Sequence, residues 1–200
     1  MQQKCWQVEK KSWRRVLRCM KVDFRRSVLS WRFVLTTAAI LGWMLLNCWD
    51  DLTQRLSAYS VAGYLSIGCA GTGNFAMLIL VIATFPFAWS YCEDKEAGFF
   101  SLAEIRVGRS AYSVSKAFWA AASSFLAAQI ALFLFYGILL AMGVTVRTEI
   151  SDGVGPYTEL ATTQGMLAFY IVRSSLTALT CGAASEFGLM ATAFLPNRYY

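Results

Sequence analysis

The chain has 200 residues, of which 57% are hydrophobic and 15% are charged, and its formal net charge is +6. Soluble domains average roughly 45–50% apolar and about 25% charged residues, so this composition excludes a disordered chain and disfavours a single soluble core. The chain has no histidine, which excludes any mechanism that depends on imidazole. Its cysteines form no Cys-x-x-Cys pair, so we expect neither a disulfide scaffold nor a metal site. We expect an integral membrane protein.

The first predicted element is a basic amphipathic helix within residues 1–32. Basic side chains are frequent in this segment, and apolar side chains recur at steps of three or four residues, namely Trp13, Leu17, Met20, Phe24, Val28 and Trp31. This pattern is typical of a helix that lies in the membrane interface. Nucleic-acid binding by a basic tail is disfavoured by the aromatic stripe and by the apolar run that follows it, so we expect no nucleic-acid partner.

Residues 33–200 form the predicted transmembrane domain, an all-α polytopic helical bundle. Four apolar stretches are long enough to cross a bilayer, which takes about 20 residues. They lie at 33–49, 75–91, within 117–146 and within 166–195. Pro86 is expected to kink the second span, because proline removes one backbone hydrogen bond.

The charges between the spans predict the orientation. Lysine and arginine collect in residues 1–32 and in the middle loop, 92–116, whereas acidic residues dominate the loops after the first and third spans. Basic residues favour the cytoplasmic side of a membrane. We therefore expect a multi-pass protein with a cytoplasmic N-terminus and middle loop, and with the two acidic loops outside.

The middle loop is the most patterned polar segment. Acidic residues open it, and a short helix with an apolar face is predicted from the spacing of Phe99, Leu102 and Ile105. Gly108 is expected to end this helix, and Ser110 is a candidate N-cap of the next one. The residues alone leave a second interpretation open, in which the loop is a solvated connector.

Three segments together resemble a known family. The segment KVDFRRSVLSWRF leads into the first span, EDKEAGF precedes the short loop helix, and R-V-G-R-S-x-Y-x-x-S-K leads into the third span. This layout is similar to that of the membrane permease subunits of ATP-binding-cassette (ABC) exporters of the type-2 class, particularly small bacterial ones. The resemblance implies that residues 1–32 form an interfacial "elbow" helix and that the loop helix is a cytoplasmic coupling helix. The implied contacts with an ATPase subunit are Glu93, Glu96, Gly98, Phe99, Phe100, Arg106 and Arg109.

The resemblance also implies a function and partners. It predicts a permease in the bacterial cytoplasmic membrane that pairs with a second permease subunit, alike or unlike, and with nucleotide-binding subunits that hold ATP and magnesium. The chain itself has no Walker A sequence and no serine hydrolase motif, so we expect no catalytic residue and no cofactor in it. Family members usually have six spans, so this chain is either truncated or a short variant.

A different class of function stays open. A non-transporting four-span protein, such as an immunity or sensor protein that binds a peptide or a membrane partner, would have the same composition. A partner ATPase would favour the exporter, and its absence would favour this alternative.

Two charges in the fourth span are candidates for the pathway or for a subunit interface. Arg173 and Glu186 are thirteen residues apart, which places them about 20 Å apart along a helix, so they are not expected to pair with each other. A charge within the bilayer should face protein or water. A purely structural polar contact is an equally open role. Small residues predict close helix packing in two places, the first half of the third span (Ala117, Ala121 and Ser124) and the fourth span (Ala178, Gly182 and Ser185).

Overall fold

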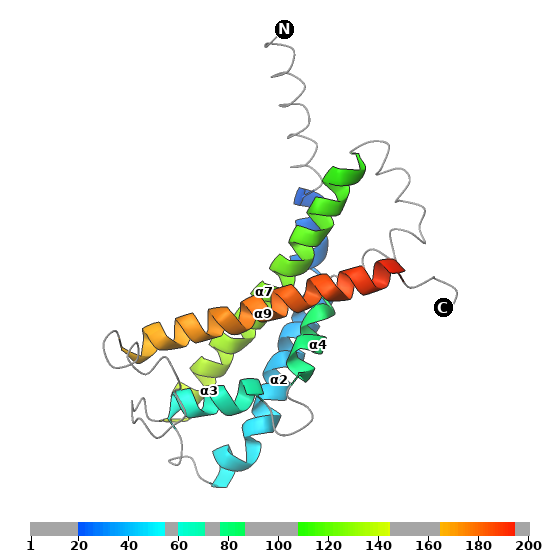
Figure 1. Ribbon diagram of the computed structural model, residues 1–200. Coiled ribbons are helices and arrows are strands. Elements are labelled where there is room, and N and C mark those ends of the chain that lie inside the picture. Colours follow the sequence, from blue (N-terminus) through cyan, green and yellow to red (C-terminus); the bar gives the residue numbers. More distant parts are fainter. Residues whose placement is uncertain (1–19, 55–59, 71–76, 87–107, 145–164, 195–200) are drawn as a thin grey trace.

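The computed structural model describes residues 20–54, 60–70, 77–86, 108–144 and 165–194, and these residues form helices and turns without any strand. A helix over residues 20–28 is followed by a two-residue bend. The helices after it, in chain order, are α2 (Trp31–Gln54), α3 (Val61–Ala70), α4 (Leu78–Thr84), α7 (Arg109–Ala141) and α9 (Met166–Phe194), as Figure 1 shows. The expected all-α architecture is confirmed for this part of the chain.

Three of the described helices are long and apolar enough to cross a membrane. Their candidate spans are Trp31–Thr53, Tyr112–Ala141 and Leu167–Ala191. They coincide with the first, third and fourth predicted spans, although α2 continues beyond the predicted end at residue 49 and includes Asp50 and Asp51. At 33 residues, α7 is about 50 Å long, so it must tilt or project beyond a hydrocarbon core of roughly 30 Å.

The second predicted span, 75–91, is described only over residues 77–86, where α4 forms. The expected kink at Pro86 concerns the continuation of the chain after residue 86, which lies outside the described residues; within them, α4 ends at Thr84. The reason is visible in the hydrogen bonds. Proline has no N–H to donate to the carbonyl of Ile82, and the N–H of Phe85 donates to that carbonyl instead, over 3.2 Å. The rest of this predicted span lies outside the described residues.

Helix α3 was not predicted, because its residues belong to the segment expected to be an outer loop. Its side chains are apolar or small on every face, and Val61, Tyr64 and Leu65 are fully buried. A helix that is apolar all round is stable only when protein or lipid surrounds it. At ten residues, about 15 Å, it is too short to be recognised as a membrane span from the length of an apolar run.

The contacts between helices establish their relative directions. Helix α3 runs antiparallel to α2, since Gly68 lies against Met44 while the carbonyl of Tyr64 accepts a hydrogen bond from Cys48. The N-terminal helix and α2 run parallel to α7, since Phe24 packs on Trp119 and residues 33–41 line a groove with residues 130–134. Helix α9 runs antiparallel to α7, since Gly182 lies against Ala121 whereas Ser174 accepts a hydrogen bond from Gln129. It crosses α7 in Figure 1 and also packs against α4.

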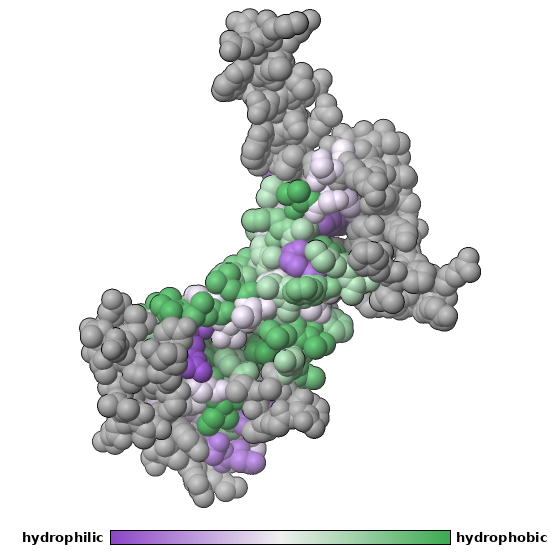
Figure 2. All heavy atoms as spheres, in the orientation of Figure 1, coloured by the Kyte–Doolittle hydropathy of each residue, from purple (hydrophilic) through white to green (hydrophobic). Residues whose placement is uncertain are grey.

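The buried core is formed mainly by α2, α3, α7 and α9. Its largest buried side chains include Ile40, Met44, Leu132, Phe135 and Tyr170. Large apolar side chains also cover the outside of the long helices, and hydrophobic residues spread across the described surface seen in Figure 2. An apolar exterior of this extent is what a bilayer would cover. The structure therefore has the character of a membrane protein.

Candidate functional site

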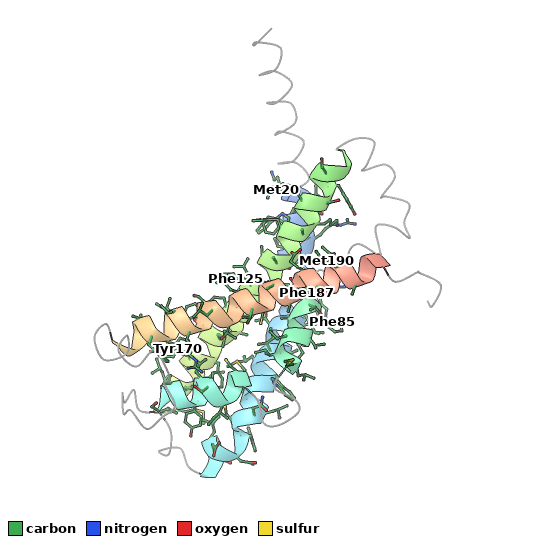
Figure 3. The ribbon with its side chains drawn as sticks, viewed as in Figure 1. Met20, Phe85, Phe125, Tyr170, Phe187 and Met190 are labelled. Carbon is green, nitrogen blue, oxygen red and sulfur yellow. The ribbon has the colours of Figure 1, made fainter. Side chains whose placement is uncertain are left out.

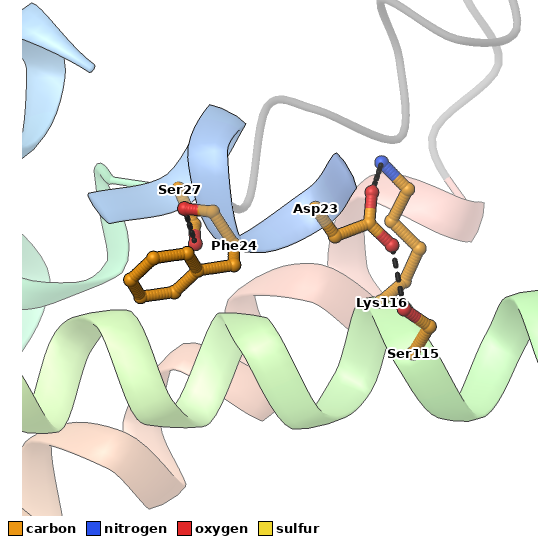
Figure 4. A network of polar contacts seen from close by, with 5 residues as sticks. All are labelled: Asp23, Phe24, Ser27, Ser115 and Lys116. Carbon is orange, nitrogen blue, oxygen red and sulfur yellow. Dashed lines mark hydrogen bonds and ion pairs between the residues drawn. The ribbon is translucent and has the colours of Figure 1, made fainter. Parts of the chain in front are cut away.

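A buried polar cluster joins the N-terminal helix to the first turns of α7 (Figure 4). The ammonium Nζ of Lys116 lies 3.3 Å from Oδ1 of Asp23, and the hydroxyl of Ser115 donates a 2.6 Å hydrogen bond to Oδ2 of the same carboxylate. Each of the three residues is at most 3% exposed. An ion pair buried to this degree needs close geometry and further hydrogen bonds to offset the lost hydration. The Ser115 hydroxyl provides one of these bonds.

Aromatic rings pack around this polar cluster. The Phe24 ring lies 5.1 Å from the Trp119 ring, and Trp119 in turn meets Phe118 edge-on at 5.3 Å. The ammonium of Lys116 lies 5.6 Å from the centre of the Tyr112 ring, within the range of a cation–π contact. Apolar and charge-based contacts therefore fix the N-terminal helix to the same three turns of α7.

Sequence reasoning assigned no role to Asp23, Ser115 or Lys116. One signal was available, because Asp23 is the only acidic residue of residues 10–32 and lies three residues after Met20 on the face that carries Phe24 and Ser27. A carboxylate on the packing face of a basic helix needs a cation on the neighbouring helix. The pairing could not be read from the sequence, since Asp23 and Ser115 are 92 residues apart.

The interface between α7 and α9 is close and partly polar. A Cβ placed on Gly182 would lie 3.2 Å from the carbonyl oxygen of Ala121, so the two backbones nearly touch there. Further along, the amide of Gln129 donates to the Ser174 hydroxyl over 3.1 Å. Ser124, Ala178, Gly182 and Ser185 are all buried, which confirms the packing surface predicted from the small residues. Figure 3 shows Phe125 and Tyr170 along this interface.

The hydroxyl of Tyr170 adds a backbone contact by donating to the carbonyl of Leu132. The α7–α9 interface is therefore held by paired polar groups as well as by close packing. Such a contact fixes the position of α9 along α7.

The two candidate charges of the fourth span are both half-buried on α9. The guanidinium of Arg173 lies 6.0 Å from the Phe169 ring. Glu186 lies one turn after Gly182, and its Oε1 atom is buried without a hydrogen-bond partner among the described residues. The two charges make no contact with each other there, as expected from their spacing. A buried carboxylate oxygen without a donor makes Glu186 the residue of this pair that is more costly to keep in place.

Most of the predicted ATPase contacts lie outside the described residues, namely Glu93, Glu96, Gly98, Phe99, Phe100 and Arg106. Arg109 is the first residue of α7, and its side chain is also outside the described part. The expectation that Ser110 caps this helix is wrong. Gly108 is the N-cap, with a φ of 94° that favours glycine, and Ser110 lies inside the first turn. Over the described ranges, no group of three or more acidic or cysteine side chains could hold a metal ion.

Compared with family models, with curated proteins and with solved structures, the chain matches none.

Proposed function

We propose that this protein is the permease subunit of an ABC exporter, which moves a substrate across the bacterial cytoplasmic membrane with ATP hydrolysed in separate subunits. The observation that supports this proposal best is the buried Asp23–Lys116 pair. It joins the N-terminal helix to α7 shortly after the segment that resembles a coupling helix. In the proposed exporter, these elements receive the force that the ATPase subunits generate.

The mechanical argument starts at the middle loop. Residues 92–107 lead into α7, whose first three turns carry Tyr112, Lys116 and Trp119. A displacement of the loop would move these turns, and the contacts of Asp23 and Phe24 would carry the N-terminal helix and α2 along with them. The close α7–α9 interface would extend this movement to α9. A path between two permease subunits would open when the helices of each move together in this way.

In this proposal the chain supplies no catalytic residue, and ATP and magnesium bind to the partner ATPase subunits. A second permease subunit completes the transport unit. The N-terminus and the middle loop are cytoplasmic. Glu186 and Arg173 are the charges of α9 that would face the pathway or the second subunit, because each is only half-buried against its own chain.

The proposal predicts that the full chain co-purifies with an ATP-binding-cassette ATPase from the membranes of its own host. Replacing both Phe99 and Phe100 by alanine should remove that ATPase while the chain still inserts in the membrane. Each buried aromatic anchor of an interface typically contributes about 2 kcal/mol, roughly a thirtyfold change in affinity. Quantitative mass spectrometry of the purified complex measures the bound ATPase directly.

Trp49→Ala is the matched control. This aromatic residue is 60% exposed and lies near the C-terminal end of α2, far along the chain from the middle loop. It should leave the amount of bound ATPase unchanged. A chain that purifies without any ATPase would contradict the exporter and favour the non-transporting alternative. Normal ATPase binding in the Phe99/Phe100 double variant would mean that the middle loop is only a connector.

A further inference from the structure

Glu186 lies on α9 at a place where this helix packs closely on α7. A Cβ added to Gly182, one turn earlier, would lie 3.2 Å from the carbonyl oxygen of Ala121, and the carboxyl group of Glu186 lies beside the backbone of the same alanine. Glu186 also belongs to the candidate membrane span Leu167–Ala191, within two turns of its end. Its carboxyl group is therefore held against a neighbouring helix inside an apolar segment.

The described residues do not satisfy this carboxyl group completely. Its Oε1 atom is buried and has no hydrogen-bond partner among them. The hydroxyl of Ser185, the adjacent residue, donates to the carbonyl of Gly182 over 2.7 Å and is thus used within its own helix. If the carboxyl group is ionised, one of its charged oxygens is left without compensation in this part of the chain.

The charged groups described on the helices around Glu186 are engaged or distant. On α7, Lys116 belongs to the buried ion pair described above, and Arg109 begins the helix two turns before it. Helix α4, which also packs on α9, has no charged or titratable residue between Leu78 and Thr84. On α9 itself, Arg173 is thirteen residues away, and Cys181 is a buried thiol. None of these groups offsets a negative charge on Glu186.

The same chain shows what a charged buried carboxylate requires. Asp23 has a cation beside one oxygen and a hydroxyl donor on the other, from Lys116 and Ser115. An ionised carboxylate without such partners is very costly in apolar surroundings, and protonation removes the charge. Glu186 has neither kind of partner among the described residues, so the neutral acid is the favourable form there.

We propose that Glu186 is a proton-binding site within the membrane and that it holds its proton at neutral pH. The ligand is the proton alone. Raising the pH breaks the O–H bond of the acid, the proton passes to water, and the carboxylate remains. This inference depends on the packing of α7 and α9 in one chain and stands independently of the proposed exporter function.

A donor on a second subunit is the competing arrangement, since polar side chains also join helices within membranes. The surface beside Glu186 favours the proton. Phe187 and Met190, its large neighbours on α9 in Figure 3, are apolar and are 74% and 59% exposed. Hydrocarbon suits such a surface, and a neutral acid can lie beside hydrocarbon at far lower cost than a carboxylate.

Infrared difference spectroscopy of the full chain in detergent tests the site, with the Glu186→Gln variant subtracted from the native chain. Glutamine keeps the shape of the acid but has no titratable O–H. We expect the C=O stretching band of a protonated carboxylic acid in the native chain only, at neutral pH, and its reversible loss at alkaline pH. Asp50→Asn is the matched control, because Asp50 is an exposed carboxylate on α2 whose replacement should remove no such band.

A second measurement needs no variant and therefore does not depend on the folding of one. Dicyclohexylcarbodiimide, an apolar reagent that adds to protonated carboxyl groups, should modify Glu186 at neutral pH at least about tenfold more than Asp50, since an exposed aspartic acid is protonated in only about one part in a thousand there. Mass spectrometry of the digested chain measures both. A native chain without the acid band at neutral pH, or an equally weak modification of the two residues, would overturn the proposal. If Glu186→Gln also separated two copies of the chain, an ionised Glu186 would belong to a subunit interface instead.

Discussion

The hydroxyl side chains of this protein fall into two groups. Most bond within their own helix, as Thr36 does to the carbonyl of Arg32 over 2.8 Å and Thr37 to that of Phe33 over 2.9 Å. This pairing lets a polar residue lie in an apolar helix without an unsatisfied group. Ser115, Ser174 and Tyr170 belong to the second group, because their hydroxyls bond to another helix, those of the serines to side chains and that of Tyr170 to the carbonyl of Leu132. The Ser174 hydroxyl also donates to the carbonyl of Ile171 in its own helix. Polar contacts of this second kind determine which helices pack together and in which register.

The buried Asp23–Lys116 ion pair leads to a prediction about single residues. Lys116→Met or Asp23→Asn leaves the other charge buried without its partner, which typically costs about 3–5 kcal/mol. The double variant should lose much less than the sum of the two, because it leaves neither charge. Thermal unfolding in detergent, followed as a double-mutant cycle, measures this coupling.

Arg25→Gln serves as the control for the ion pair. Arg25 is an exposed charge on the same helix, and its replacement should change stability by no more than about 0.5 kcal/mol. Strict additivity of the Asp23 and Lys116 variants would mean that the two residues do not depend on each other. The proposed transmission of movement from α7 to the N-terminal helix would then lose its support.

At the scale of elements, long apolar runs were predictable and short ones were not. The hydrophobic run that became α9 was predicted as a span within 166–195, and the helix covers Met166–Phe194. Such a run needs no tertiary information, because a membrane helix satisfies its own backbone. Helix α3 differs, since its burial depends on contacts with α2, such as the one between Gly68 and Met44. The Asp23–Lys116 pair was missed for the same reason, because only the packing of two helices brings its residues together.

Gly182 provides a prediction about the pair of helices α7 and α9. A methyl group at this position would lie 3.2 Å from a backbone carbonyl oxygen, which cannot move without moving the whole of α7. Gly182→Ala should therefore destabilise the protein slightly, and Gly182→Leu by about 1–3 kcal/mol or more, as overpacking does. The melting temperature in detergent measures both. Gly137→Leu is the control, since Gly137 is exposed on α7 with no atom within 4 Å of an added Cβ, and it should melt like the native chain.

The topology of the whole molecule has two parts, the relative directions of the helices and their absolute orientation in the membrane. The contacts show α2 and α7 running in the same direction and α9 running in the opposite one. This agrees with the directions expected of the first, third and fourth spans. Because α2 and α7 run in the same direction, the chain must reverse its direction between them, and α3, antiparallel to α2, begins that reversal. The absolute orientation is a separate matter, which depends on the distribution of lysine and arginine.

Cysteine labelling at the ends of the segment 20–54 and of α7 tests the relative directions of the helices and their absolute orientation together. In a chain whose native cysteines are replaced by alanine, Thr53→Cys and Met142→Cys should react with a membrane-impermeant maleimide in intact cells. Arg25→Cys and Ser110→Cys should react only after the membrane is opened. All four positions are exposed, so differences in labelling report the side of the membrane rather than burial. If Arg25 and Ser110 were labelled from opposite sides, the parallel packing of the two helices would be wrong. If both were labelled from outside, the packing would stand, but the positive-inside assignment would be reversed, and the middle loop could not contact a cytoplasmic ATPase.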